Sequence, residues 1–310
     1  MLKLIYSDFY RLLKNKIILF LDLCAVAYYV YSIVDSITSI DKIRNDLYID
    51  SMNPTYSIYF IFLIIVLTSI IFCSENFSNR TINNKLICGH SRLEIYVSTL
   101  IVNAFNAILL TLPLFIYDAV TSKLANVNFG IGMVFVGFCV LFSVIISISA
   151  ASISFITGKR LISLIVCFSV LFCMIGTSKY IYSVLNEPEK LHFIQTVNGK
   201  PYDGENVIYD SDDVVYGERP NPDYPSNGQR KICKFIEDSS PTLQIFKLNN
   251  INKIYGNPFK DIKGKYFINN GDEIKNIKDI SKIINPCGVI VFCMIITSGG
   301  YIIFKKKDIK

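Results

Sequence analysis

The sequence contains no tryptophan, only two histidines and few charged residues. Asp, Glu, Lys and Arg make up 18% of the 310 residues, whereas soluble domains average about 25%. Apolar residues make up 52%, and the mean hydropathy is +0.42. This composition excludes an ordinary soluble domain and indicates a membrane protein. The basic residues that flank the predicted spans on one side, described below, account for the net charge of +6. We therefore expect no nucleic acid partner.

The sequence also lacks the motifs of an enzyme. Its Gly-Lys pairs, at 158–159, 199–200 and 264–265, have neither the following Ser or Thr nor the earlier Gly of a phosphate-binding loop. The two histidines, at 90 and 192, are far apart and predict no metal site. The cysteines lie mostly in apolar runs, so we expect no disulfide framework. We therefore expect no enzyme and no cofactor in this chain.

Six apolar segments are long enough to cross a bilayer, which takes roughly 20 residues of helix. We predict an all-α polytopic membrane protein with six transmembrane helices. Only a four-residue turn, "TGKR", separates the fourth and fifth segments, which predicts a tight hairpin. The six predicted spans are 17–34, 56–73, 96–120, 130–156, 161–185 and 283–304.

The distribution of positive charge predicts the orientation. Segments 1–16, 74–95, 157–160 and 305–310 together carry 13 Lys and Arg, whereas the two short loops opposite carry three. Both termini should therefore be cytoplasmic, and the long segment between the fifth and sixth spans should lie outside.

The first 16 residues form an amphipathic pattern. Ile5, Phe9 and Leu12 fall on one helical face, and we expect Asp8 and Arg11 to lie mostly elsewhere. Such a helix can lie in the membrane interface before the first span. The alternative is a frayed basic flank.

The polar stretch "ENFSNRTINNKLICGHSRLEIY", residues 75–96, contains two helix-end signals. Ile82 and Leu86 have helical spacing, and Gly89 suits a left-handed C-terminal cap. Ser91 and Glu94 form a capping box that restarts a helix into the third span. We predict a short helix across the cytoplasmic mouth, where it could serve as a handle for a partner.

Three segments resemble ABC-2-type permeases. In residues 75–101 an acidic residue is followed by a basic residue with Thr, by a Gly and by Ser-Arg before the third span. The chain end "GGYIIFKKKDIK" is similar to the usual finish of that family, and "LIYSDFYRLLKNK" resembles its N-terminal interface helix. The resemblance covers residues 1–185 and 283–310.

The resemblance implies a permease subunit of an ATP-driven exporter in a bacterial cell membrane. A second permease, identical or homologous, would complete the transmembrane unit, and a separate cytoplasmic ATPase would bind ATP and Mg. The substrate would be lipophilic or a peptide, such as an antimicrobial peptide in resistance or immunity. The short helix would be the coupling helix, and the residues that the resemblance assigns to ATPase coupling are Glu75, Arg80, Thr81, Gly89, Ser91 and Arg92.

Residues 186–282 differ in composition from the spans and depart from the short connection usual in that family. Turn clusters alternate with strand-like runs at 206–210 and 213–217. Ser240 and Pro241 predict the start of a helix over 240–251 that lies on or in the outer leaflet. We predict an extracellular α+β insert, which divides the chain into 1–185, 186–282 and 283–310.

Three polar residues within the spans are candidates for a substrate path. Asp22 lies in the first span, and Asn103 and Asn106 lie in the third. Charged groups are costly inside a membrane and often functional. The alternative, which we favour, is that Asp22 makes a helix contact or reaches interfacial water and that the asparagines form hydrogen bonds between helices.

A second function class is compatible with the same sequence. The chain could be a membrane-bound sensor or interaction protein whose outer segment binds a peptide without transporting it. A neighbouring ATPase gene would favour transport, and a neighbouring kinase gene alone would favour sensing.

Overall fold

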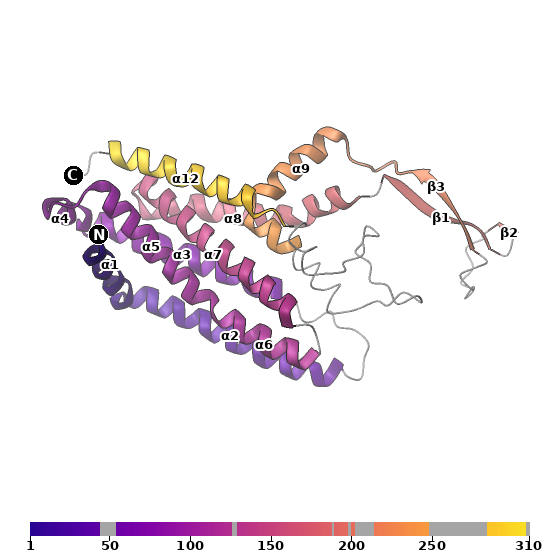
Figure 1. Cartoon of the computed structure of the whole chain (residues 1–310), viewed down its shortest axis with the longest axis horizontal. Coiled ribbons are helices and arrows are strands. Elements are labelled where there is room, and N and C mark those ends of the chain that lie inside the picture. The colour runs from indigo at the N-terminus through magenta and orange to yellow at the C-terminus, as the bar shows by residue number, and fades with distance from the viewer. Residues whose placement is uncertain are drawn as a thin grey trace.

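The apolar segments of the sequence fold into long helices that run side by side (Figure 1). The computed structural model describes residues 1–43, 54–125, 129–187, 189–197, 200–201, 214–247 and 284–307. Six helices in the described residues are long and apolar enough to span a membrane, which confirms the predicted number. The helices that form these spans are α2 (Lys16–Ile43), α3 (Pro54–Ser78), α5 (Arg92–Thr111) with α6 (Pro113–Ala125), α7 (Phe129–Thr157), α8 (Arg160–Asn186) and α12 (Pro286–Lys306).

The predicted third span, 96–120, corresponds to an apolar span over Arg92–Tyr117. Within it a single turn residue, Leu112, separates α5, which ends at Thr111, from α6, which begins at Pro113. Proline lacks the backbone N–H that would continue the helical ladder. Helix α3 runs five residues beyond the predicted 73, so Glu75 lies in a helix and not in the loop that follows it.

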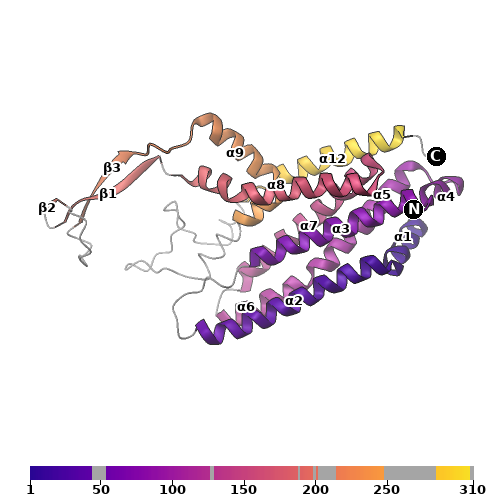
Figure 2. The same ribbon diagram turned by 180° about the vertical axis from the view of Figure 1, so that it is seen from behind.

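Helix α7 forms the centre of the bundle and packs against α3, α5, α8 and α12 (Figure 2). Small side chains let its neighbours approach closely. A Cβ atom added at Gly300 of α12 would lie 2.7 Å from the Tyr96 hydroxyl and 3.1 Å from Ser152 Cβ. Such close packing of small residues is a usual way to join helices in a membrane.

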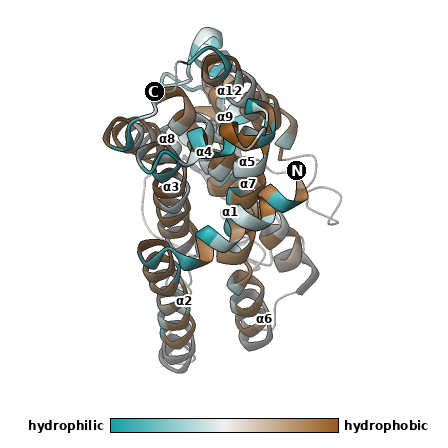
Figure 3. Ribbon diagram, turned by 90° about the vertical axis from the view of Figure 1, so that its left-hand side faces the viewer, coloured by the Kyte–Doolittle hydropathy of each residue, from teal (hydrophilic) through white to brown (hydrophobic). Residues whose placement is uncertain are grey.

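Two short helices lie at the end of the bundle that carries both termini, hereafter the termini end (Figure 3). Helix α1 (Leu2–Lys14) crosses this end, and α4 (Thr81–Ile87) connects α3 to α5. The predicted N-terminal amphipathic helix is confirmed. The prediction that Asp8 lies away from the apolar face was wrong, because Asp8 is fully buried on the same face as Leu4 and Leu12.

The opposite end, hereafter the far end, carries a small sheet and helix α9 (Asn227–Ser239). The sheet contains β1 (Lys190–Val197), β2 (Lys200–Pro201) and β3 (Val214–Pro220) in the antiparallel order β2-β1-β3. The strand predicted at 213–217 falls largely within β3, and the one predicted at 206–210 lies outside the described residues. The separation of 186–282 as a domain and its placement outside the cell stay predictions.

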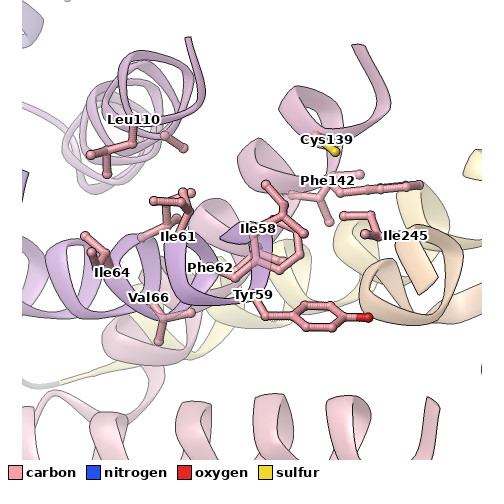
Figure 4. Close-up of a cluster of buried hydrophobic side chains, with 14 of the residues drawn as sticks. Ile58, Tyr59, Ile61, Phe62, Ile64, Val66, Leu110, Cys139, Phe142 and Ile245 are labelled. Atoms are coloured by element: carbon pink, nitrogen blue, oxygen red, sulfur yellow. The ribbon is translucent and has the colours of Figure 1, made fainter. Parts of the chain in front are cut away.

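A short helix over 241–247 packs inside the far end of the bundle. Leu243 and Ile245 are buried, and Ile245 joins the cluster that Phe142 and the α3 residues form (Figure 4). The Tyr59 hydroxyl donates to the Thr242 carbonyl oxygen at 3.3 Å. Residues 241–247 therefore pack against protein, and the position of this helix on or in the outer leaflet stays a prediction. Residues 248–251 lie outside the described residues.

Candidate functional site

Helix α4 is closed at both ends by the signals that its sequence contains. Gly89 has φ +85°, the Gly89 N–H donates to the Leu86 carbonyl oxygen at 3.0 Å, and the His90 N–H donates to that of Lys85 at 3.1 Å. These two bonds form the predicted left-handed cap. Ser91 and Glu94 form the predicted capping box at the start of α5. The short helix and its turn are therefore a defined structure and not a flexible linker.

A buried ion pair joins α4 to α1. Lys85 Nζ of α4 lies 2.5 Å from Asp8 Oδ1 of α1, and the Ser98 hydroxyl of α5 donates to Asp8 Oδ2 at 2.6 Å. Arg11 Nη1 approaches Asp8 Oδ1 at 3.4 Å. Asp8 is 0% exposed and Lys85 is 7% exposed. One carboxylate therefore holds three helices together.

The burial of this ion pair has a consequence for its chemistry. Burial lowers the pKa of the Lys85 ammonium, and the Asp8 carboxylate opposes that shift. A buried charge that loses its partner costs several kcal/mol, so each member of the pair depends strongly on the other. The pair fixes the position of α4 relative to α1.

Two further hydrogen bonds connect the beginning of the chain to α3. Arg11 Nη1 donates to Asn76 Oδ1 at 2.6 Å, and Asn15 Nδ2 donates to Glu75 Oε2 at 2.6 Å. Asn15 lies between α1 and α2. Glu75 therefore holds the joint between α1 and α2 against α3.

Basic side chains donate hydrogen bonds to carbonyl oxygens at the C-terminal ends of two spans. Arg92 Nη1 donates to the carbonyl oxygens of Phe304, Lys305 and Lys307, at 3.0, 2.9 and 2.7 Å. Lys307 Nζ donates to the carbonyl oxygens at 155 and 156 in α7, at 3.4 and 3.2 Å. The last carbonyls of a helix have no intrahelical partner and attract cations. Arg92 thereby ties the loop after α4 to the end of α12.

The outer side of α4 is exposed and partly apolar. Ile87 is 83% exposed at the last position of the helix, and Cys88 and Gly89 beside it are also exposed. Arg80, at the other end of α4, is exposed and adopts a positive φ of 53°. An isolated isoleucine at the tip of a braced helix can insert into an apolar cleft of another protein.

The residues predicted for ATPase coupling separate into two groups. Arg80, Gly89 and Ser91 are exposed near the two ends of α4, and Thr81 is half-buried. Glu75 and Arg92 instead bond to other parts of the same chain. Sequence reasoning missed Asp8, Lys85 and Ile87. The position of Asp8 on the apolar face of α1 was the one signal that could have revealed the buried pair.

Asn103 and Asn106 are buried in the bundle, and Asp22 is half-buried. Asn106 Nδ2 donates to Thr68 Oγ1 at 3.4 Å, so it joins α5 to α3. Asn103 Nδ2 donates to the Thr99 carbonyl oxygen of its own helix at 2.8 Å and lies 3.5 Å from Cys73 Sγ. One oxygen of Asp22 is buried without a hydrogen-bond partner in the described part of the chain. These contacts agree with the helix-contact alternative for Asn106.

An apolar groove of about 80 Å³ lies between α8 and α12, with α7 as its floor. Ser149 is the one hydroxyl on its lining, and Pro241 closes the groove beside the far end. The groove lies within the part of the bundle that is apolar enough to span a membrane. Its lining suits hydrocarbon and offers almost no partner to a polar ligand. The side chains that line it are Val66, Ile145, Ile146, Ser149, Ala150, Ile153, Cys167, Val170, Leu171, Met174, Pro241, Val289, Phe292 and Ile296.

Within the described residues, no group of three or more His, Cys, Asp or Glu side chains could hold a metal ion. The cysteines in the described residues are all free, and Cys233, which the sequence places in the outer segment, is buried between α9 and α8. Comparison of the chain with family models, curated proteins and solved structures finds no match.

Proposed function

We propose that this chain is the transmembrane permease subunit of an ATP-driven exporter and that α4 docks into a separate cytoplasmic ATPase. The observation that carries the proposal is that one short helix has both an exposed apolar side chain and a buried ion pair that fixes its position. Ile87 projects from α4, while Lys85 two residues earlier is locked onto Asp8. A helix that only connected two spans would need neither feature.

The bracing gives a route by which movement of α4 could move the bundle. Lys85 connects α4 to α1, Asp8 connects α1 to Ser98 of α5, and Arg92 connects the start of α5 to the end of α12. A push on Ile87 would therefore reach the first, third and sixth spans together. In this proposal the termini end faces the cytoplasm of a bacterial cell, and ATP and Mg bind only the ATPase.

The apolar lining of the groove between α8 and α12 supports a lipophilic substrate, or a peptide with a lipophilic surface, over a small polar one. Export of such molecules fits a role in resistance or immunity to antimicrobial peptides. A second permease, identical or homologous, would complete the pathway. Under this proposal the lipid bilayer is a third partner, since the groove opens within the spans.

The test is reconstitution with an ATPase encoded beside this chain. Ile87→Asp should abolish the association and the stimulation of ATP hydrolysis by the permease, because a charge cannot enter an apolar cleft. Ile87→Leu keeps the apolar bulk and should bind normally. Equal binding by both variants, or an ATPase that never associates with the intact chain, would contradict the proposal.

The sheet at the far end favours a second candidate, a sensor that binds a peptide without transport. Among the described residues, the outer edge of β3 and the short β2 have no strand beside them, so an extended peptide could pair there. This candidate predicts peptide binding with no ATPase partner. Measurement of ATP-dependent substrate movement in vesicles separates the two functions.

A further inference from the structure

Helix α9 has apolar side chains on two opposite faces. One face packs on the bundle, where Cys233 contacts a cluster with Ile181 of α8 and Leu243. The opposite face carries Ile232 and Phe235, with Ile236 at its edge, and these side chains are 63%, 71% and 36% exposed. Residues spaced by three and four lie together on a helix. Together these three side chains form the outer ridge of α9.

Two contacts fix α9 against the ends of the spans. Arg230 donates to the carbonyl oxygens of Val184, Leu185 and Glu187 at the end of α8, at 3.5, 3.2 and 3.4 Å. A Cβ atom added at Gly288, in the first turn of α12, would lie 2.3 Å from the Asp238 carbonyl oxygen. Both ends of α9 are thus held, so α9 cannot turn to bury its outer ridge against the bundle.

The position of α9 places this ridge beside the surface that the spans present to lipid. Figure 1 shows α9 projecting from the side of the bundle at the far ends of α8 and α12. Three to seven residues beyond Gly288 along α12, Val291, Met294 and Ile295 are all more than half exposed. The outer ridge therefore continues the apolar surface of the spans at the depth where the spans end.

We propose that the outer ridge of α9 inserts into the boundary between headgroups and acyl chains of the leaflet at the far end. Lys231 is exposed beside the ridge, where a long basic side chain can reach lipid phosphates. An amphipathic helix with this arrangement lies in the plane of the interface. The proposal is independent of transport and of the side of the membrane that the far end faces.

The absence of tryptophan from the chain gives a direct test. Phe235→Trp places a single indole on the outer ridge of the full-length protein in lipid nanodiscs. Met294→Trp, on the exposed side of α12, is the lipid-facing reference. Asp223→Trp, in the exposed turn before α9, is the water-facing reference. The measured quantities are the emission maximum and the quenching by lipids brominated on the acyl chain near the headgroup.

The expected result is a Phe235→Trp emission that is blue-shifted from that of Asp223→Trp and that loses most of its intensity in brominated lipid. Acyl chains brominated near their ends should quench Met294→Trp more than Phe235→Trp. Emission that matches Asp223→Trp would overturn the proposal. So would a blue-shifted emission that brominated lipid does not quench, because another protein surface, from this chain or a second copy, would then cover the ridge.

Discussion

Lys85 and Asp8, 77 positions apart in the sequence, form a buried ion pair at 2.5 Å where the chain begins and where its second span ends. The pair joins α4, the short helix between two spans, to the amphipathic helix α1 that crosses the termini end. Because Asp8 also accepts from Ser98, a single carboxylate determines how α1, α4 and α5 sit together.

This relationship predicts a strongly non-additive pair of mutations. Lys85→Met leaves the Asp8 carboxylate buried without its main partner and should destabilise the protein by about 3–5 kcal/mol. The double variant Asp8→Leu with Lys85→Met removes both charges and should recover most of that loss. Thermal unfolding in detergent of the wild type, both single variants and the double variant measures the coupling. Additive losses would show that the pair contributes nothing beyond its separate members.

Arg80 supplies a way to separate folding from coupling. Its positive φ costs an ordinary residue roughly 1–2 kcal/mol, and glycine adopts this conformation freely. Arg80→Gly should therefore keep or raise the thermal stability while it removes the side chain from the proposed docking surface. The expected result is a stable protein with weakened stimulation of ATP hydrolysis, and Arg80→Glu should weaken it further. Full stimulation by both variants would exclude Arg80 from the interface.

The sequence predicted elements whose determinants are local. The six spans follow from apolar runs, and the cap at Gly89 and the capping box at Ser91 follow from residues within a few positions of each other. The Lys85–Asp8 pair could not be predicted in this way, because its members meet only after α1 folds back over α4 and α5. The hydrogen bonds from Arg92 to the end of α12 could not be predicted either, because their acceptors lie more than 200 positions later in the chain.

The helix at the far end shows which part of a structure local sequence can predict. Ser240 and Pro241 predicted where the helix begins, and the Leu243 N–H donates to the Ser240 hydroxyl at 3.4 Å. The buried position of 241–247 was not predicted, because it depends on hydrogen bonds that Gln244 makes only in the folded chain. Its amide is satisfied by the Glu237 carbonyl oxygen at 2.8 Å and by the Asn285 N–H at 3.3 Å, and only the fold supplies these partners.

Glu237 predicts an acid-sensitive contact at the far end. Burial would raise the pKa of its carboxyl, but hydrogen bonds from Lys234 and Lys247 outweigh burial and lower it. A carboxyl whose pKa is lower in the folded protein stabilises the fold above its unfolded pKa, and this contribution is lost as the pH falls through the folded pKa. The protection of residues 227–239 against hydrogen exchange, relative to an unfolded peptide at the same pH, should therefore decrease in acid, below the ordinary glutamate range.

A variant separates this effect from general acid unfolding. Glu237→Gln should be less protected already at neutral pH and should show a smaller further loss of protection in acid. Asp223→Asn, at an exposed carboxyl, is the matched control and should behave as the wild type. Identical pH profiles for Glu237→Gln and the wild type would contradict the assignment.

The membrane orientation is testable with two exposed thiols. Cys233 is a poor reporter because it is buried, whereas Cys88 is exposed at the termini end. In a chain whose other cysteines are replaced, an impermeant thiol reagent should label Cys88 only after the cells are permeabilised. Asp223→Cys at the far end should be labelled in intact cells. The reverse pattern would place the termini outside.

The most direct test of the proposed function uses the thiol beside Ile87. With Cys88 as the only cysteine, a short photo-crosslinker attached to its sulfur should capture a single neighbouring protein in native membranes, identified by mass spectrometry. The account predicts an ATPase that carries the phosphate-binding loop missing from this chain, and it predicts no such product from Asp223→Cys at the far end. Crosslinks only within this chain, or only to a protein without that loop, would contradict the account.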